Sequence, residues 1–308
     1  MNITINCSPH LRSSLNTPQI MRHVILALMP AVAAAVFLFK TPALLVIVNC
    51  VAASMLTEEI VTRIRKKPSA VGDCSAALTG LLLALTLPPA TTWYAAVLGS
   101  VFAILVGKHL FGGLGCNIFN PALIGRAFLM AAYPKMLTTF TQPFSVDAVS
   151  GATPLAMRKF SAQITPTIDL FLGTVSGSLG ETSVLCLVLG GFYLLVRKIA
   201  DWRIPLGMIF TAGLISGIFY LINPANGSVQ FHLCAGGLVL GAFFMATDPV
   251  TTPVTRIGRY IFGIGCGLMM MVIRYFSGLP EGVMYSILFM NAFTPLINRY
   301  TRPKGFGR

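Results

Sequence analysis

A short polar stretch near the middle of the chain, residues 147–155, holds the side chain best suited to covalent chemistry. Its members are Asp147, Ser150, Gly151, Ala152 and Thr153, followed by Pro154. Because the residue before a proline is pushed toward an extended conformation, we expect the Thr153 hydroxyl to be held stiffly and exposed. Its small neighbours would leave it open to a modifying enzyme. An ordinary helix cap or Ser/Gly turn is the competing interpretation of so short a motif.

A glycine-rich turn, residues 112–120, is a second candidate site, because it leads directly into an apolar segment. Asn120 stands where a helix cap would be, and Pro121 suits the first position of a helix. The free N–H groups at the start of such a helix could bind an anion or the edge of a flavin. Without other evidence, such a turn is only a weak indication of a binding site.

Charged residues within or beside apolar segments are costly and often functional. Arg126 lies inside one such segment and could neutralise a flavin or pair with carbonyl groups, or it could simply cap a neighbouring helix end. Asp248 lies at a break and could belong to an ion or flavin site, although Asp before Pro is also a common turn former. Glu58 and Glu59 are followed one turn later by arginines, which favours helical ion pairs.

The composition points to a membrane protein with several spans. The chain has 308 residues, of which 55% are hydrophobic and 10% charged. Its net charge of +13 comes from basic residues that flank apolar segments, so they indicate topology and exclude nucleic-acid binding. Seven scattered cysteines with no C-x-x-C pair argue against an iron-sulfur or zinc site, and we expect no metal centre.

About ten apolar segments are candidates for membrane spans, since crossing a bilayer takes about 20 residues of helix. They are residues 21–39, 42–62, 76–87, 93–111, 121–133, 183–196, 206–222, 233–246, 257–276 and 283–297. The third, fifth, eighth and tenth are short. A cytoplasmic N-terminus leaves most Lys and Arg residues on the inner side. Both termini are then expected in the cytoplasm, and the loop with Thr153 on the outer face.

The segments divide into two halves of five, residues 1–133 and 183–308, joined by an external loop, residues 134–182. Gly113, Leu123 and Phe128 recur with unchanged spacing as Gly278, Leu288 and Phe293. Because five spans is an odd number, such a repeat must be inverted across the membrane. Short or broken helices at matching places in inverted halves indicate a binding site near the midplane.

The pattern D-x-x-S-G-A-T that ends at Thr153 resembles the site at which flavin transferases attach FMN to a threonine through a phosphoester. Residues 112–128, 246–253 and 281–297 resemble sequence blocks of the same membrane proteins. The chain is therefore similar to the RnfD/NqrB family, which contains the D subunit of the Rnf complex and the B subunit of the Na+-translocating NADH:quinone oxidoreductase. Its brief N-terminal segment favours the Rnf protein.

The resemblance implies a component of an ion-translocating ferredoxin:NAD oxidoreductase in a bacterial or archaeal cytoplasmic membrane. Thr153 would carry FMN, with Ser150, Gly151 and Ala152 giving access to the flavin transferase and Asp147 serving as its distal recognition residue. A non-covalent riboflavin is also implied. Electrons would arrive from the FMN of the G subunit on the outer face, leave toward the C subunit on the nicotinamide side, and be coupled to movement of Na+ or H+.

The expected all-α fold also admits a different class of function. Two inverted five-helix halves are similar in outline to urea-transporter-type proteins, so a passive channel or transporter for a small polar solute is the rival. Fold alone does not decide between them. A solute channel, however, has no use for the motif at Thr153.

Overall fold

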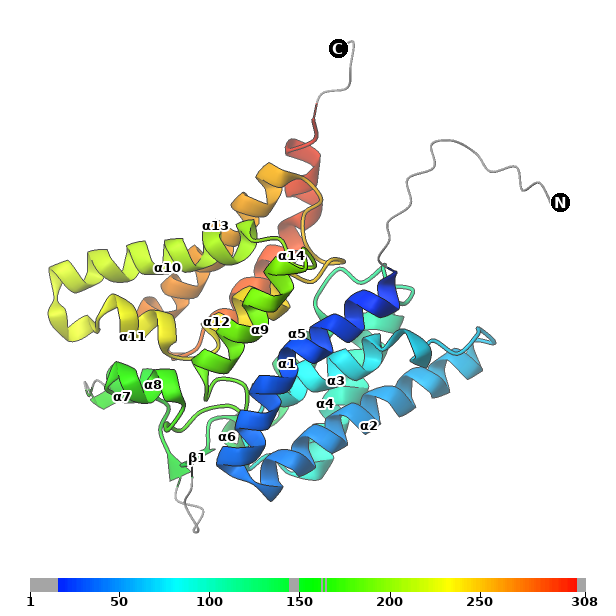
Figure 1. Cartoon of the computed structure of the whole chain (residues 1–308), viewed down its shortest axis with the longest axis horizontal. Helices are drawn as coiled ribbons and strands as arrows, with labels where there is room; N and C mark the ends of the chain where they lie inside the picture. The colour runs from blue at the N-terminus through cyan, green and yellow to red at the C-terminus, as the bar shows by residue number, and fades with distance from the viewer. Residues whose placement is uncertain (1–15, 144–149, 162, 164, 304–308) are drawn as a thin grey trace.

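Helices of very different lengths make up most of the described chain (Figure 1). The structure is a computed structural model that describes residues 16–143, 150–161, 163 and 165–303. The first half contains α1 (Thr17–Phe39), α2 (Thr41–Ile64), η1 (Val71–Asp73), α3 (Ser75–Thr86), α4 (Trp93–Ile104), η2 (Leu105–His109) and α5 (Pro121–Ala132). The connecting loop contains α6 (Pro134–Leu137), β1 (Phe140–Thr141), β2 (Ser150–Gly151), α7 (Pro154–Ser161) and α8 (Thr167–Leu172). The second half contains α9 (Val184–Val196), α10 (Arg203–Ile222), η3 (Pro224–Asn226), α11 (Val229–Cys234), α12 (Leu238–Leu240), η4 (Gly241–Met245), α13 (Arg256–Phe276) and α14 (Val283–Tyr300).

Every apolar segment expected from the sequence lies on a helix. In the described residues, α1, α2, α10 and α13 are long and apolar enough to cross a membrane alone. A fifth candidate is a pair of helical stretches, Pro224–Cys234 and Leu238–Met245, bent by 43° at the break between them. These helices identify a membrane protein, and α3, α5 and α9 are shorter apolar helices among them.

The helical fold class is confirmed, and two details differ from the expectation. The last apolar segment is longer than expected, because α14 runs for 18 residues and continues through Pro295. The described chain also contains one short antiparallel pair, β1 and β2, in which Phe140 lies opposite Gly151. This pair joins two stretches in the first part of the central loop, residues 134–182.

The helices of the two halves pack in corresponding ways. In the first half α2 contacts α3 and α4, and α4 contacts α5; in the second half α10 contacts α11 and α13, and α13 contacts α14. The halves meet where α1 contacts α9 and α5 contacts α14. Gly190 permits the first of these contacts, because a Cβ there would lie 2.0 Å from the carbonyl oxygen of Ala27.

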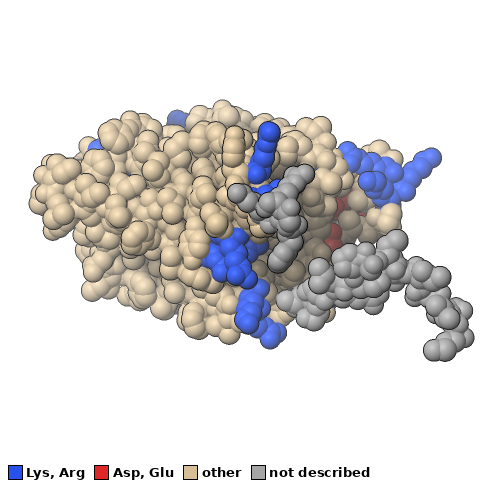
Figure 2. Space-filling view, turned by 90° about the horizontal axis from the view of Figure 1, so that it is seen from above, with Lys and Arg blue, Asp and Glu red and all other residues tan. Residues whose placement is uncertain are grey.

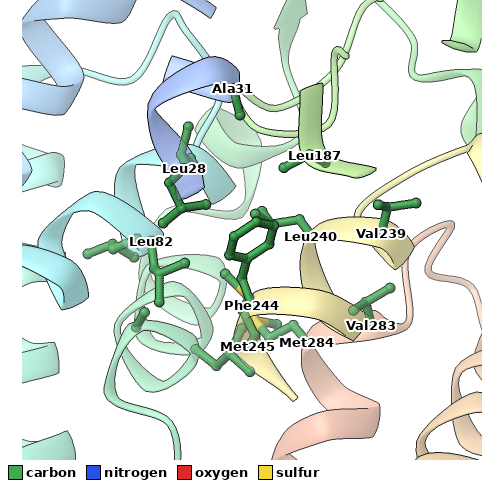
Figure 3. Packing of buried hydrophobic residues seen from close by; sticks show 14 of the residues in the cluster. Leu28, Ala31, Leu82, Leu187, Val239, Leu240, Phe244, Met245, Val283 and Met284 are labelled. Carbon is green, nitrogen blue, oxygen red and sulfur yellow. The ribbon is translucent and has the colours of Figure 1, made fainter. Parts of the chain in front are cut away.

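Phe244 lies at the centre of the junction between the halves. Figure 3 shows its ring among Leu28 of α1, Leu82 of α3 and Leu187 of α9, which come from both halves of the chain. Phe244 belongs to η4, a stretch of π-helix, and a second π-helix, η2, ends the fourth apolar segment. Such bulges are frequent at functional sites, and both lie beside the cavities described below.

The outer surface is largely apolar, as a lipid-facing surface must be. Leu221 is 85% and Phe210 65% exposed on α10. Figure 2 shows a face that is mostly uncharged, with Lys and Arg gathered in a few groups and little acidic surface.

Candidate functional site

Thr153 caps a short helix in the central loop. Its Oγ accepts a hydrogen bond from the backbone N–H of Ala156 at 3.3 Å, and its carbonyl oxygen accepts one from Met157 at 2.8 Å. The side chain is only 4% exposed. The expectation of an exposed hydroxyl is therefore wrong in this conformation, because the helix start that Thr153 caps turns the hydroxyl inward.

The rest of the attachment motif is partly described. Asp147 lies outside the described residues. Ser150 and Gly151 form β2, and Ala152 is exposed. Gly151 lies so close to Ser176 that a Cβ would stand 2.5 Å from its hydroxyl oxygen. Any larger residue at position 151 would therefore push the loop away from Ser176.

The space beside Thr153 is small. Including adjoining open space it measures about 280 Å³, and it is lined by residues that include Leu155, Leu170, Glu181 and Cys234. Sites for molecules of the size of a flavin usually offer about 300–1,000 Å³ of enclosed space. In this conformation the pocket beside Thr153 does not fit a flavin.

A larger cavity, of about 690 Å³ including adjoining open space, lies next to this pocket, and Glu181 lines both. Arg126 projects from α5 into the larger cavity. Its guanidinium donates to the carbonyl oxygen of Thr86, the last residue of α3, at 2.6 Å and to Glu281 at 2.6 Å. The alternative interpretation of Arg126 as a cap on a neighbouring helix end is thus confirmed. We call this space the outer cavity.

Glu181 is the titratable group of the outer cavity, in the loop between α8 and α9. Burial raises the pKa of its carboxyl to about 7, the charge of Glu281 adds to the rise, and Arg126 opposes it. Its backbone is held in place because the N–H groups of Leu179 and Gly180 donate to carbonyls at the end of α3. The carboxyl is therefore fixed between the Thr153 pocket and the outer cavity.

Glu181 predicts a specific dependence of stability on pH. Folding raises its pKa above the value of about 4.3 for an unfolded chain, so its protonated form stabilises the fold. That contribution is complete below about pH 4 and is lost as the pH rises through about 7. We expect the melting temperature in detergent to fall between about pH 5 and pH 8, and Glu181→Gln to remove part of this fall. The same change at Glu59, a surface residue, should leave the slope as it is; an unaltered slope in the Glu181 variant would contradict the assignment.

A second cavity, of about 730 Å³ including adjoining open space, lies between the start of α5 and the end of η4, and we call it the inner cavity. Asn120 and Asp248 both line it. Asn120 caps α5, as expected, by accepting a hydrogen bond from the N–H of Ala122 at 3.0 Å, and it donates to the carbonyl oxygen of Met245 at 3.2 Å. The amide oxygen of Asn117, also in the lining, is buried and has no hydrogen-bond partner.

Asp248 is a turn former, as one of the two interpretations holds, and it also lines the inner cavity. Its carboxylate accepts hydrogen bonds from Val250 N–H and Thr251 Oγ, each at 3.3 Å, as a turn former does. Desolvation nevertheless raises the pKa of the Asp248 carboxyl to about 6, and the residue faces the inner cavity. The structure therefore brings Asn120 and Asp248 together, and it places Arg126 in the other cavity.

Lys108 and Glu58 form a buried ion pair that the sequence argument missed. Lys108 Nζ lies 2.8 Å from Glu58 and 2.7 Å from Ser75 Oγ, and the two charged side chains are 2% and 1% exposed. His109 Nε2 lies 3.1 Å from the other oxygen of Glu58. The expected helical pair exists only for Glu59, 2.6 Å from Arg63. The position of Lys108 within an apolar segment was the sequence feature that could have revealed this pair. No comparable feature marked Glu181 or Glu281 as a site residue.

Comparison with known proteins matches nearly the full sequence of this chain to one family. The family model described as "NQR2, RnfD, RnfE family" matches residues 4–307. The chain belongs to this family. It is 47% identical to the D subunit of the proton-translocating ferredoxin:NAD(+) oxidoreductase complex of Clostridium ljungdahlii, over 99% of this chain and 96% of that protein.

Two further members of the NQR2, RnfD, RnfE family carry similar names. The chain is 45% identical to the D subunit of the Na(+)-translocating ferredoxin:NAD(+) oxidoreductase complex of Acetobacterium woodii, over 100% of this chain and 96% of that one. It is 42% identical to the D subunit of the ion-translocating oxidoreductase complex of Stutzerimonas stutzeri, over 97% of this chain and 94% of that protein. These relatives are components of multi-subunit enzyme complexes, and the resemblance to the Rnf protein is confirmed.

Proposed function

We propose that this chain is the membrane flavoprotein subunit of an ion-translocating ferredoxin:NAD oxidoreductase complex. It passes electrons through FMN esterified to Thr153, and the complex couples their flow to movement of Na+ or H+. The observation that carries the proposal is similarity to the D subunits of such complexes over nearly the full length, together with the motif at Thr153. No feature of the described residues favours a passive channel, and the named relatives above do not include a quinone reductase.

The arrangement of helices supports the proposed topology of ten spans in two inverted halves. The two halves repeat the same order of helix contacts. The outer cavity is lined by the end of α3 and the starts of α12 and α14; the inner cavity is lined by the end of η4 and the starts of α3 and α5. An inverted repeat would exchange these elements in this way and would give one cavity on each side of the midplane.

The proposed orientation places both termini in the cytoplasm and Thr153 on the outer face. In Figure 1 the start of α1 and the end of α14 lie at the end of the molecule opposite β1 and α7. In this orientation the loop with Thr153 would face the FMN-carrying G subunit. The C subunit would bind on the nicotinamide side, and the inner cavity would lie nearer to it.

The inner cavity is the better site for the non-covalent riboflavin. Including adjoining open space it measures about 730 Å³, against about 280 Å³ for the pocket beside Thr153. Its walls are apolar, and Asn117, Asn120 and Asp248 would supply the polar contacts. A flavin supplies one-electron chemistry when bound, and the residues around it fix its position and tune its electronics.

Acid precipitation of the purified protein tests the proposal. Cells that also produce a flavin transferase should yield a yellow protein whose pellet keeps one flavin while riboflavin is released into the supernatant. A colourless pellet from an active complex would exclude the covalent flavin, and a colourless protein in both fractions would favour the solute channel.

A further inference from the structure

The Thr153 hydroxyl is enclosed by a helix that is fastened down at three places. Leu155, 4% exposed, packs in a cluster with Leu170, Phe231 and Ala235. The side chains of Arg158 and Lys159, further along α7, make the other two attachments. Each attachment connects α7 either to another part of the central loop or to the second half of the chain.

Lys159 holds α7 against the C-terminal end of α13 and the residues after it, and it uses all three N–H donors of its ammonium group to do so. Its ammonium group donates to the carbonyl oxygens of Arg274 at 2.9 Å, Leu279 at 3.0 Å and Ser277. Carbonyls in the last turn of a helix have no partner within the helix and carry its negative dipole end. A lysine with three donors satisfies them well.

Arg158 makes the other polar attachment. It donates to the carbonyl oxygen of Asn226 at 2.7 Å and contacts the ring of His232. Its guanidinium also lies over the ring of Tyr275, 5.0 Å from the centroid. Hydrogen bonds from charged donors and a cation–π contact together make α7 dock firmly.

We propose that α7 is a latch: Thr153 receives its flavin only when α7 is undocked, and the docked position described here is that of the unmodified chain. The inference rests on the proposed function, because it concerns the same hydroxyl. It follows because Thr153 is only 4% exposed, whereas a transferase must reach its hydroxyl. A pocket of about 280 Å³ also leaves no room for a flavin beneath a docked α7.

The chemistry of attachment requires this access. A phosphoester bond forms between Thr153 Oγ and the phosphorus of FMN, while the pyrophosphate bond of a flavin dinucleotide donor breaks and AMP leaves. The hydroxyl proton passes to a base of the transferase. The phosphorus must approach Oγ in line with the bond that breaks, and no such approach exists while Oγ faces the N–H of Ala156 inside the loop.

Labelling of Thr153→Cys in the full-length purified chain tests the latch. A maleimide is added, and its incorporation is followed by mass spectrometry of the peptide that contains residue 153. We expect slow labelling relative to Cys116, which is exposed. Adding Lys159→Met should speed it about tenfold, since a hydrogen-bonded charge is lost. Lys159→Arg should stay near the parent, as should Lys135→Met, which changes an exposed lysine outside α7.

Flavin attachment supplies the second readout. With purified transferase and FAD, Lys159→Met in the otherwise unchanged chain should gain covalent flavin several times faster than the parent. Equal rates of labelling and attachment in parent and Lys159→Met would overturn the latch. Faster labelling with no flavin on Thr153 in any variant would show that Lys159 holds α7 in its docked position, but it would overturn the proposed function and the role of α7 in flavin attachment.

Amide hydrogen exchange adds a test without substitution. Residues 154–161 should exchange faster in protein made with the transferase than in protein made without it, because the loaded chain cannot return to the docked position. Identical exchange in a fully loaded sample would contradict the latch.

Discussion

Thr153→Val is expected to abolish covalent flavin while leaving a folded membrane protein. The substitution removes the only atom of residue 153 that can form a phosphoester. It also removes the acceptor that caps α7, since Oγ accepts from Ala156 N–H. Loss of such a cap costs about 0.5–2 kcal/mol, which a domain with this core should tolerate. In-gel fluorescence after denaturation, with the mass of the peptide that contains residue 153, measures the outcome.

Two further substitutions at the same position separate the cap from the anchor. Thr153→Asn keeps a strong capping side chain but has no hydroxyl, so it should cap α7 and carry no flavin. Thr153→Ser keeps both functions and should retain flavin. Thr138→Val, at an exposed threonine of the same loop, should behave like the parent. A fluorescent band that persists in Thr153→Val would refute the assignment of the anchor.

Lys108→Met is expected to produce the largest loss of stability. It removes the ammonium group that pairs with the buried Glu58 carboxylate, which is 1% exposed. Removing one member of a buried ion pair typically costs about 3–5 kcal/mol, because the other charge stays desolvated. The free energy of unfolding in detergent, followed by circular dichroism, should fall by that amount.

Two controls show whether the buried charge is the cause. The double variant Lys108→Met with Glu58→Gln should recover most of the loss, since no net charge remains unpaired. Glu59→Gln breaks a surface pair, 2.6 Å from Arg63, in which the arginine is 78% exposed. That change should cost no more than about 1 kcal/mol. An equal loss in the double and single Lys108 variants would show that packing, and not charge, holds this region together.

The helices were predictable because their signal is local. An apolar run bounded by charges and prolines specifies a helix in a membrane whatever surrounds it, and residues such as Pro121 and Asn120 mark where one begins. The length of α14 was not predictable in the same way. Whether Pro295 ends a helix or is carried inside it depends on neighbours that satisfy the backbone, and these come from other parts of the chain.

The candidate sites were predictable only as single residues. Arg126, Asn120 and Asp248 stood out by type and position, but they do not share a site, since Arg126 faces the outer cavity and the other two face the inner one. In the sequence, neither the type nor the position of Glu181 marked it as a site residue. It became important because the end of α3 and the loop before α9 bring it between the Thr153 pocket and Arg126.

The amino-acid sequence alone determined that this is a helical membrane protein, that it resembles a family of electron-transfer proteins, and that one threonine has the context of a flavin anchor. These properties depend on residue types and short spacings. Only the tertiary structure decided that Thr153 is enclosed, that Lys108 pairs with Glu58 rather than standing alone, and that Arg126 lines one cavity while Asn120 and Asp248 line another. Burial and pairing depend on contacts between residues that are distant in the chain, which no local pattern records.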